Sequence, residues 1–347
     1  MPTAVSSEWE DDVMTARLTT GLLGGALLAL LGVSRLASPG PMPVAQSQAD
    51  DVRAALDAAN MQLAAMGAHT RISQVEWLTR SETGQVGQTV FFSSRGNKQI
   101  SADFVAGDPR RGGRTNILYL VDQSDGAAVG GLTNADTEAA IDRAAASWND
   151  VACSDIPIEK APDTGVDPDS ADFFFGGGDL GTLNLGPVTA VDIVHGGFAG
   201  AALFDAVTPG CVPGSFTNPC GSVFILGFTF TEIFVDDDGN PTDINGDGKF
   251  DVAFREIFYN NADPDANGNT VPWRINAFPD VESVALHEFG HGLSQAHFGE
   301  VFLTNNNGKI HFAPLAVMNA GTDRVSQELL GTDVGGHCSI WGSWPNK

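Results

Sequence analysis

The chain has 347 residues, enough for one large domain or two ordinary domains with a substantial buried core. Its 18 Lys and Arg residues stand against 43 Asp and Glu residues, which gives a formal net charge of −25 at pH 7. Nucleic acid and anionic membrane surfaces repel such a charge, so neither is expected as a partner. The charge suits a secreted, salt-tolerant or calcium-binding protein, and a well-solvated surface explains it equally.

The first part of the chain contains a short apolar run. Residues 18–34 carry no charge, Arg17 precedes them, and small residues follow around Ala45. This pattern predicts a signal peptide or an N-terminal anchor over residues 1–47, with Met14 as the initiator because the acidic residues 8–12 do not suit a signal's start. We therefore expect a secreted, extracellular protein with no stable membrane partner after processing.

Residues 48–114 are expected to form a prosegment or a small N-terminal domain. The pattern predicts a helix over 48–68 and strands over Ile72–Leu78 and Gln88–Ser93. The segment has no cysteine. The basic stretch Asp108–Arg114 is interpreted as a flexible boundary, either a processing site or an uncut linker.

Residues 115–347 are expected to form one further domain. A strand over Asn116–Val121 is followed by a helix from the N-cap Thr133 to Trp148, whose apolar side would be buried. Later strand-like runs are Ile156–Glu159, Ala190–Val194, Val223–Phe230 and Ala253–Tyr259. A second helix is expected to begin near Val281. Strands that alternate with a helix and are followed by two helices predict an α+β protein.

The loop before the last of these strands is rich in oxygen ligands. Asp243, Asn245, Asp247 and Asp251 alternate as in a calcium-binding loop, because alternate side chains of a tightly curled loop converge on one hard cation. Phe254 stands where an EF-hand has its glutamate, so the motif is incomplete. A possible calcium site and an Asp/Asn-rich surface turn both remain open.

The most specific motif is His287, Glu288 and His291, followed six residues later by His297. Residues i and i+4 share one face of a helix, so His287 and His291 can bind the same ion. Neutral imidazole is a favoured zinc ligand, and three histidines leave a fourth position for water, as in catalytic zinc sites. The alternative is an amphipathic helix with histidines on its polar face.

This motif resembles the signature of the metzincin zinc endopeptidases, HExxHxxGxxH followed by a Met-turn. The resemblance implies that the three histidines bind zinc and that Glu288 is the general base. The segment Ala316–Ala320 resembles the Met-turn, which implies that Met318 forms an apolar floor beneath the ligands. Ser294 stands where the family has the glycine that turns the chain back, and Gly292 is expected to take part of the bend.

The C-terminal stretch narrows the resemblance. Leu330–Gly342 is similar to the closing helix of matrixins, L-x-x-D-x-x-G-x-x-x-L-Y-G, and Asp333 falls on its acidic position. The resemblance covers about residues 115–347. It implies an α+β, metzincin-like fold, in which a twisted mixed sheet packs on helices, with a zinc helix, a Met-turn and a C-terminal helix.

The same resemblance implies a function. We expect a secreted zinc-dependent endopeptidase that hydrolyses peptide bonds with a zinc-activated water, with Zn2+ and Ca2+ as cofactors and a polypeptide as substrate. Substrates would lie extended beside the edge strand, expected at Ala253–Tyr259, with a specificity pocket walled by Met318 to Thr322. The alternative is a metal-stabilised extracellular binding or structural protein with little or no catalysis. A zinc hydrolase acting on other bonds is a third.

Four cysteines in an exported chain predict two disulfides. Cys211 and Cys220 would close a short loop, and Cys153 would then pair with Cys338, although the other pairings remain open. Asp192 and His195 are interpreted as structural, with a further metal site as the alternative. Of the remaining histidines, His311 and His337 are expected to be structural and His69 to lie on the surface.

Overall fold

The computed structural model describes residues 46–92, 101–122, 127–128, 130–163, 191–215, 218–261, 272–304 and 309–346. The predicted leader lies outside these ranges except for its last residues, which begin the first helix. No helix within the described residues is long and apolar enough to cross a membrane.

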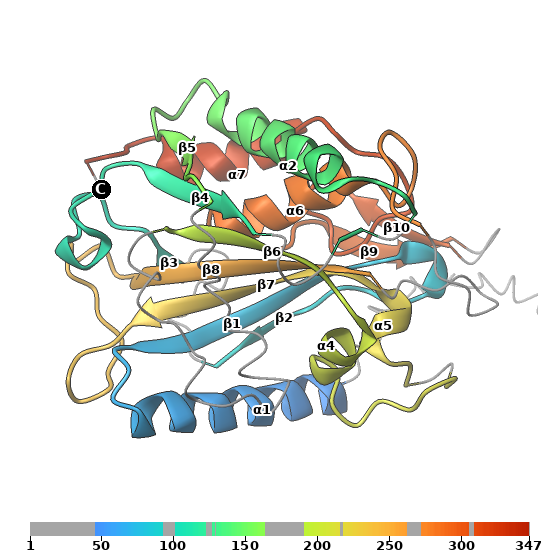
Figure 1. The fold of residues 1–347 in the computed structure, drawn as a ribbon, viewed down its shortest axis with the longest axis horizontal. Coiled ribbons are helices and arrows are strands. Elements are labelled where there is room, and N and C mark those ends of the chain that lie inside the picture. Colours follow the sequence, from blue (N-terminus) through green and yellow to red (C-terminus); the bar gives the residue numbers. More distant parts are fainter. Residues whose placement is uncertain are drawn as a thin grey trace, which may run out of the picture. The chain divides into compact units, whose positions relative to one another are not determined.

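One mixed sheet runs through the described part of the chain (Figure 1). Its order is β2-β1-β7-β8-β6-β4-β5, and β3 also pairs with β8. The strands are β1 (Thr70–Thr79), β2 (Thr89–Phe91), β3 (Ala102–Asp103), β4 (Ile117–Val121), β5 (Ile158–Lys160), β6 (Ile193–Ala199), β7 (Ile225–Phe234) and β8 (Phe250–Asn260). Strands β5, β4, β6 and β8 run parallel to one another, whereas β7 is antiparallel to β8, β1 to β7 and β2 to β1.

Helices cover both faces of this sheet (Figure 1). The helix α1 (Gln46–Ala65) lies on one face, and α2 (Asn134–Asn149), α6 (Val281–Gly292) and α7 (Gly331–Trp341) lie on the other. The shorter elements are η1 (Ser81–Thr83), η2 (Pro109–Arg111), α4 (Ala201–Ala206), α5 (Gly221–Phe224), β9 (Glu300–Leu303) and β10 (Ile310–Ala313). The predicted α+β class, with a mixed sheet packed on helices, is confirmed.

Each helical layer has its own buried apolar cluster. The larger cluster joins the sheet to α2, α6 and α7 and includes Trp148, Phe289 and Trp341. A second cluster joins α1 to the opposite face through residues such as Leu56 and Trp77. The buried side predicted for α2 is confirmed, and Thr133 caps this helix by accepting a hydrogen bond from the Asp136 N–H.

The prediction that Ala253–Tyr259 is an edge strand is wrong. These residues lie within β8, which pairs with β7 on one side and with β6 on the other. Every residue of β8 is buried, as expected for a strand covered on both faces. Beyond β7 on this side, the segment before residue 114 adds β1 and β2 to the same sheet.

Residues 46–346 form one compact unit in their described parts, so the segment that we predicted as 48–114 packs with the rest of the chain. Its boundary is not flexible. Arg111 is fully buried and donates hydrogen bonds to Asp192 and to the Val105 carbonyl, and Arg110 pairs with Asp108 and Asp251. Whether the chain is cut there stays a prediction.

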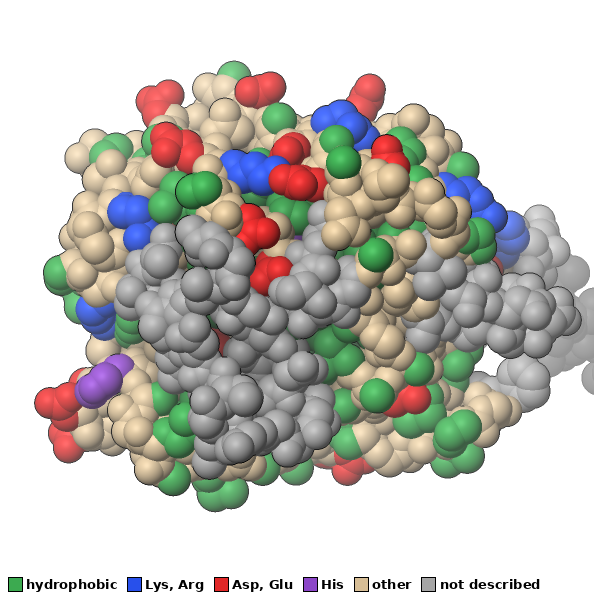
Figure 2. Space-filling model, viewed as in Figure 1, with side chains coloured by type: hydrophobic (Ala, Val, Ile, Leu, Met, Phe, Trp, Pro, Cys, Tyr) green, Lys and Arg blue, Asp and Glu red, His purple; other side chains and the backbone are tan. Residues whose placement is uncertain are grey.

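Both expected disulfides are present: Cys153 pairs with Cys338 and Cys211 with Cys220. The first joins the segment after α2 to α7, and the second closes a short loop after α4. On the face seen in Figure 2, basic side chains lie among acidic ones. Among the ion pairs of the described residues, Lys160 contacts Glu138 and Asp142 at 2.5 and 2.9 Å.

Candidate metal centre

The helix α6 carries the first two predicted ligands. It begins after Asp280, whose carboxylate accepts a hydrogen bond from the Ser283 N–H at 2.9 Å. All residues from Val281 to Gly292 are buried, so the helix passes through the interior beneath the sheet. One face of this buried helix presents both His287 and His291 to the same point.

The three predicted ligands converge. The Nε2 atom of His291 lies 3.1 Å from that of His287 and 3.2 Å from that of His297. A zinc ion with Zn–N bonds of about 2.0–2.1 Å and tetrahedral angles needs nitrogens about 3.3–3.4 Å apart. The observed spacing is close to this value, so the three histidines fit a tetrahedral metal ion. They form a potential metal-binding group within the described residues.

The outer nitrogens of two ligands are anchored. His287 Nδ1 lies 2.7 Å from the Val317 carbonyl, and His291 Nδ1 lies 2.7 Å from the Gln295 carbonyl. A carbonyl accepts only from a protonated nitrogen, so these contacts leave each Nε2 lone pair for the metal. Burial lowers the pKa of His287 and of His297, with His291 adding to both shifts, which keeps these imidazoles neutral.

A left-handed residue brings His297 back to the helix. Ser294 has φ 67°, the conformation for which the related motif uses glycine. Contrary to our expectation, Gly292 does not take part in the bend, because it lies within α6 and its φ is not positive. The Ser294 hydroxyl accepts a hydrogen bond from Arg255 at 3.0 Å, and the same guanidinium donates to the His291 carbonyl. Arg255 therefore stabilises the turn that the sequence left in doubt.

Substitution of Ser294 tests this turn. Glycine removes a strain of about 1 kcal/mol but loses the Arg255 contact, so Ser294→Gly should keep zinc affinity nearly unchanged. Ser294→Val should weaken zinc binding by roughly tenfold or more, because a β-branched residue resists positive φ. Competition with a chelating dye measures both affinities. Equal zinc affinity in the two variants would show that the turn does not depend on residue 294.

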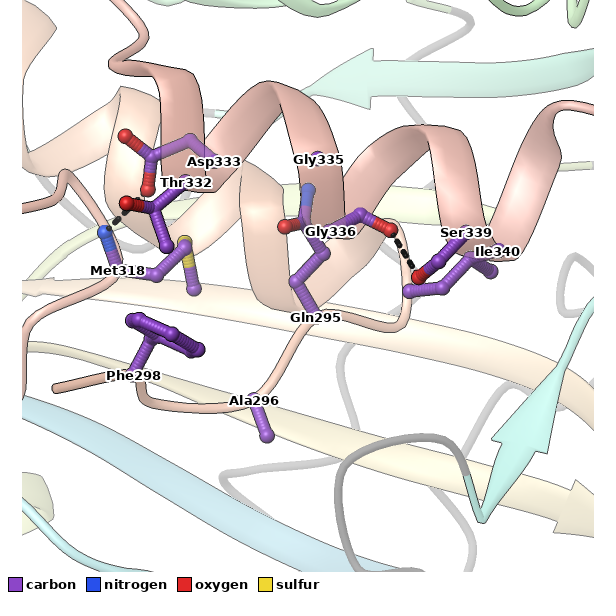
Figure 3. A pocket seen from close by; sticks show the side chains of 10 residues that line it. All are labelled: Gln295, Ala296, Phe298, Met318, Thr332, Asp333, Gly335, Gly336, Ser339 and Ile340. Atoms are coloured by element: carbon purple, nitrogen blue, oxygen red, sulfur yellow. Dashed lines mark hydrogen bonds between the residues drawn. The ribbon is translucent and has the colours of Figure 1, made fainter.

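Met318 and Asp333 form the support beneath the ligands. Met318 is buried, and a Cβ added at Gly290 would lie 2.3 Å from its Sδ atom, so the side chain packs directly against α6. Figure 3 shows Asp333, from α7, reaching the Met318 backbone. Its carboxylate accepts hydrogen bonds from the Val317, Met318 and Leu330 N–H groups at 2.9–3.0 Å. The adjoining cavity of ≈ 380 Å³ lies between this turn and α7.

Asp333→Asn should lower the free energy of unfolding by about 1–3 kcal/mol, because an amide replaces one of the two accepting oxygens with a donor. Urea denaturation measures the change. The exposed Asp323 serves as the control, since Asp323→Asn should change stability by less than about 0.5 kcal/mol. If the two variants were equally stable, Asp333 would not hold the turn.

The predicted general base lies beside the histidines. Glu288 is fully buried, and its Oε2 accepts a hydrogen bond from the Thr229 hydroxyl of β7 at 2.7 Å. A Cβ at Gly227 would lie 3.0 Å from Oε1, so glycine at this position makes room for the carboxylate. Burial raises the pKa of Glu288 to about 7, which is suited to proton transfer near neutral pH.

One acidic residue at the site, Glu76, escaped prediction. Glu76, on β1, is fully buried and its Oε2 lies 3.2 Å from His291 Nδ1. Burial raises the pKa of Glu76, but the charges of His291, His297 and Arg255 outweigh burial and lower it to about 2. The same pairing, against the effect of burial, raises the pKa of His291. The only sequence signal was an acidic residue within a strand-like apolar run.

The predicted calcium loop is an exposed turn. Asp243 accepts hydrogen bonds from the Asp247 and Gly248 N–H groups, and Asn245 accepts a longer one from the same Asp247 N–H. Asp251, in β8, pairs with Arg110 and accepts hydrogen bonds from the Thr242 hydroxyl and the Ile244 N–H. Within the described residues, the carboxylates of Asp243, Asp247 and Asp251 do not come together as a potential metal-binding group. Calcium binding stays a prediction.

The other candidate residues have structural surroundings. The Asp192 carboxylate pairs with Arg111 and Arg114, and His195 Nδ1 lies 2.5 Å from the Tyr259 hydroxyl. Burial lowers the pKa of His195 to about 3. The remaining histidines are His337, which stacks on Trp148, His311, which stacks on Phe302, and the exposed His69.

Comparison with protein-family models gave no match, and comparison with curated proteins gave none either. The assignment of this site therefore depends on its own geometry.

Proposed function

We propose that this chain is a zinc-dependent endopeptidase of the metzincin type, with a matrixin-like catalytic part over residues 115–347. The observation that carries the proposal is the convergence of three imidazole Nε2 atoms beside the buried carboxylate of Glu288. Two disulfides support our proposal that it acts outside the cytoplasm.

His287, His291 and His297 would hold the metal, and their all-nitrogen set suits zinc. Bound zinc would supply Lewis-acid chemistry, activating water and polarising a peptide carbonyl. Glu288 would take the proton from the attacking water on a carboxylate oxygen and return it to the leaving amine. Thr229 keeps this carboxylate oriented through its hydroxyl.

A metal-stabilised binding or structural protein remains the second candidate. The observation that favours it is the depth of the site, since His287, Glu288 and His291 are all buried and a strand covers them. The buried carboxylate of Glu288 beside the histidines argues against it, because a purely structural metal site needs no general base.

The test is cleavage of casein by the zinc-loaded protein. The proposal expects cleavage that stops when phenanthroline removes zinc and that is lost when Glu288 is replaced. One zinc per chain without cleavage dependent on Glu288 would favour the second candidate.

A further inference from the structure

Strand β1 is held along both of its edges near the metal centre. It pairs antiparallel with β7 from Thr70 to Thr79. On its other side, the Thr79 carbonyl accepts a hydrogen bond from the Thr322 N–H, and the Ser81 N–H donates to the Thr322 carbonyl, both at 2.9 Å. Thr322 follows the Met318 turn. A peptide ligand that adds to a sheet is held in a similar way, by backbone hydrogen bonds to a strand on one side and to a neighbouring segment on the other.

The side chains of β1 alternate between two environments. Val75 and Trp77 point to the cluster under α1. Leu78 belongs to the cluster that contains α6, and Glu76 contacts His291 on that side. Alternation along a strand therefore places Glu76 and Leu78 over the metal centre.

Every part of the centre is touched by β1 or its hairpin partner β2. Glu76 lies beside His291, Leu78 lines a small cavity with His287, and the Thr89 hydroxyl of β2 lies 3.4 Å from His297 Nδ1. Glu288 lies against β7 at Gly227 and Thr229, whose partners on β1 are Leu78 and Glu76. The stretch from Glu76 to Leu78 therefore faces the general base.

Leu78 forms one wall of the small cavity beside His287. The cavity is walled by α6 and by the chain after Met318, with Val317, Gly321 and Thr322 among its lining residues. The space that remains is ≈ 10 Å³, about the smallest volume that holds one water molecule. These lining residues correspond in part to the predicted specificity pocket, so Leu78 packs against the residues expected to wall that pocket.

From these contacts we propose that β1 occupies the substrate-binding cleft and keeps the enzyme latent until it is displaced. This inference rests on the proposed endopeptidase function. A substrate would replace β1 as an extended polypeptide antiparallel to β7, with a leucine-sized apolar side chain beside His287. Glu76 excludes solvent from the histidines while β1 is in place.

The test uses the zinc-loaded full chain and two readouts that need no hydrolysis. The first is the rate at which phenanthroline removes zinc. The second is binding of a labelled peptide of residues 73–82, measured by fluorescence anisotropy. Leu78→Ala should speed zinc removal by roughly tenfold or more and should allow the peptide to bind, because truncation of a buried leucine weakens the docking of β1. Glu76→Gln should act in the same direction.

Val252→Ala is the matched control, since Val252 is equally buried in the same sheet but lies on β8. It should leave both readouts within about twofold of the wild type. A peptide with aspartate in place of its leucine should not bind the Leu78→Ala protein. Zinc removal from Leu78→Ala at the wild-type rate would overturn the proposal. So would a lower zinc affinity in Glu76→Gln alone, which would make Glu76 a positioning residue for His291.

The two proposals can fail separately. Faster zinc removal and peptide binding without casein cleavage in any variant would reject the endopeptidase and retain the occupied cleft. Casein cleavage by the wild-type chain as fast as by Leu78→Ala would retain the endopeptidase and reject latency.

Discussion

Glu288→Gln is expected to reduce casein cleavage by about 10²–10⁴-fold, the usual range for loss of a general base, while zinc content stays at one per chain. Glutamine has the same shape and can still accept the Thr229 hydrogen bond, but it cannot take a proton from water. Because we propose that β1 covers the site, the comparison is best made in the Leu78→Ala background. Cleavage rate and zinc content are measured on the same preparation.

Glu282→Gln is the control for this change. Glu282 lies on the same helix and contacts Arg143 at 2.6 Å, away from the histidines. Its substitution should leave cleavage within about twofold. If Glu288→Gln retained more than about a tenth of the activity, Glu288 would not be the base that the account requires.

His291→Ala is expected to weaken zinc binding by more than about 100-fold. Loss of a residue that only hydrogen-bonds to a metal ligand commonly lowers metal affinity by about 10–100-fold, and loss of the ligand itself should lower it further. His291 is the central member of the group, since its Nε2 lies within 3.2 Å of both other ligands. Its loss should also remove the stabilisation of folding that zinc provides. Competition titration gives the affinity, and thermal denaturation with and without zinc gives the stability.

His311→Ala serves as the matched histidine control. His311 stacks on Phe302 in the β9–β10 hairpin and lies outside the group. Zinc affinity and the zinc-dependent rise in melting temperature should match those of the wild type. Equal zinc affinity in the His291 and His311 variants would show that zinc binds elsewhere in the protein.

The local features of the metal centre were predictable from the sequence. The i,i+4 spacing placed two histidines on one helical face, and a third lay close enough in the chain to return. Helix caps such as Thr133 and the paired cysteines also have local signals. The elements β1, β4, α2, β7 and β8 lie near their predicted bounds because their apolar periodicity reflects burial, whereas β6 runs later than predicted and short elements such as β3 and β9 were not predicted.

The covering of the site was not predictable in this way. Glu76 and His291 are 215 residues apart in the sequence. The apolar pattern of a strand predicts the strand itself but not which other elements will lie beside it. The same limit explains the wrong assignment of β8 to the sheet edge, since the apolar pattern of β8 does not show that β7 and β6 lie on its two sides. The sequence likewise gave no signal that Arg255, a charged residue within a strand, would stabilise the turn at Ser294.

The most direct test of the central claim is a crystal structure of the zinc-loaded chain with anomalous scattering recorded across the zinc edge. The account predicts one anomalous peak about 2.0–2.1 Å from the Nε2 atoms of His287, His291 and His297. A peak coordinated elsewhere, or a His297 ring directed away from the other two, would contradict it.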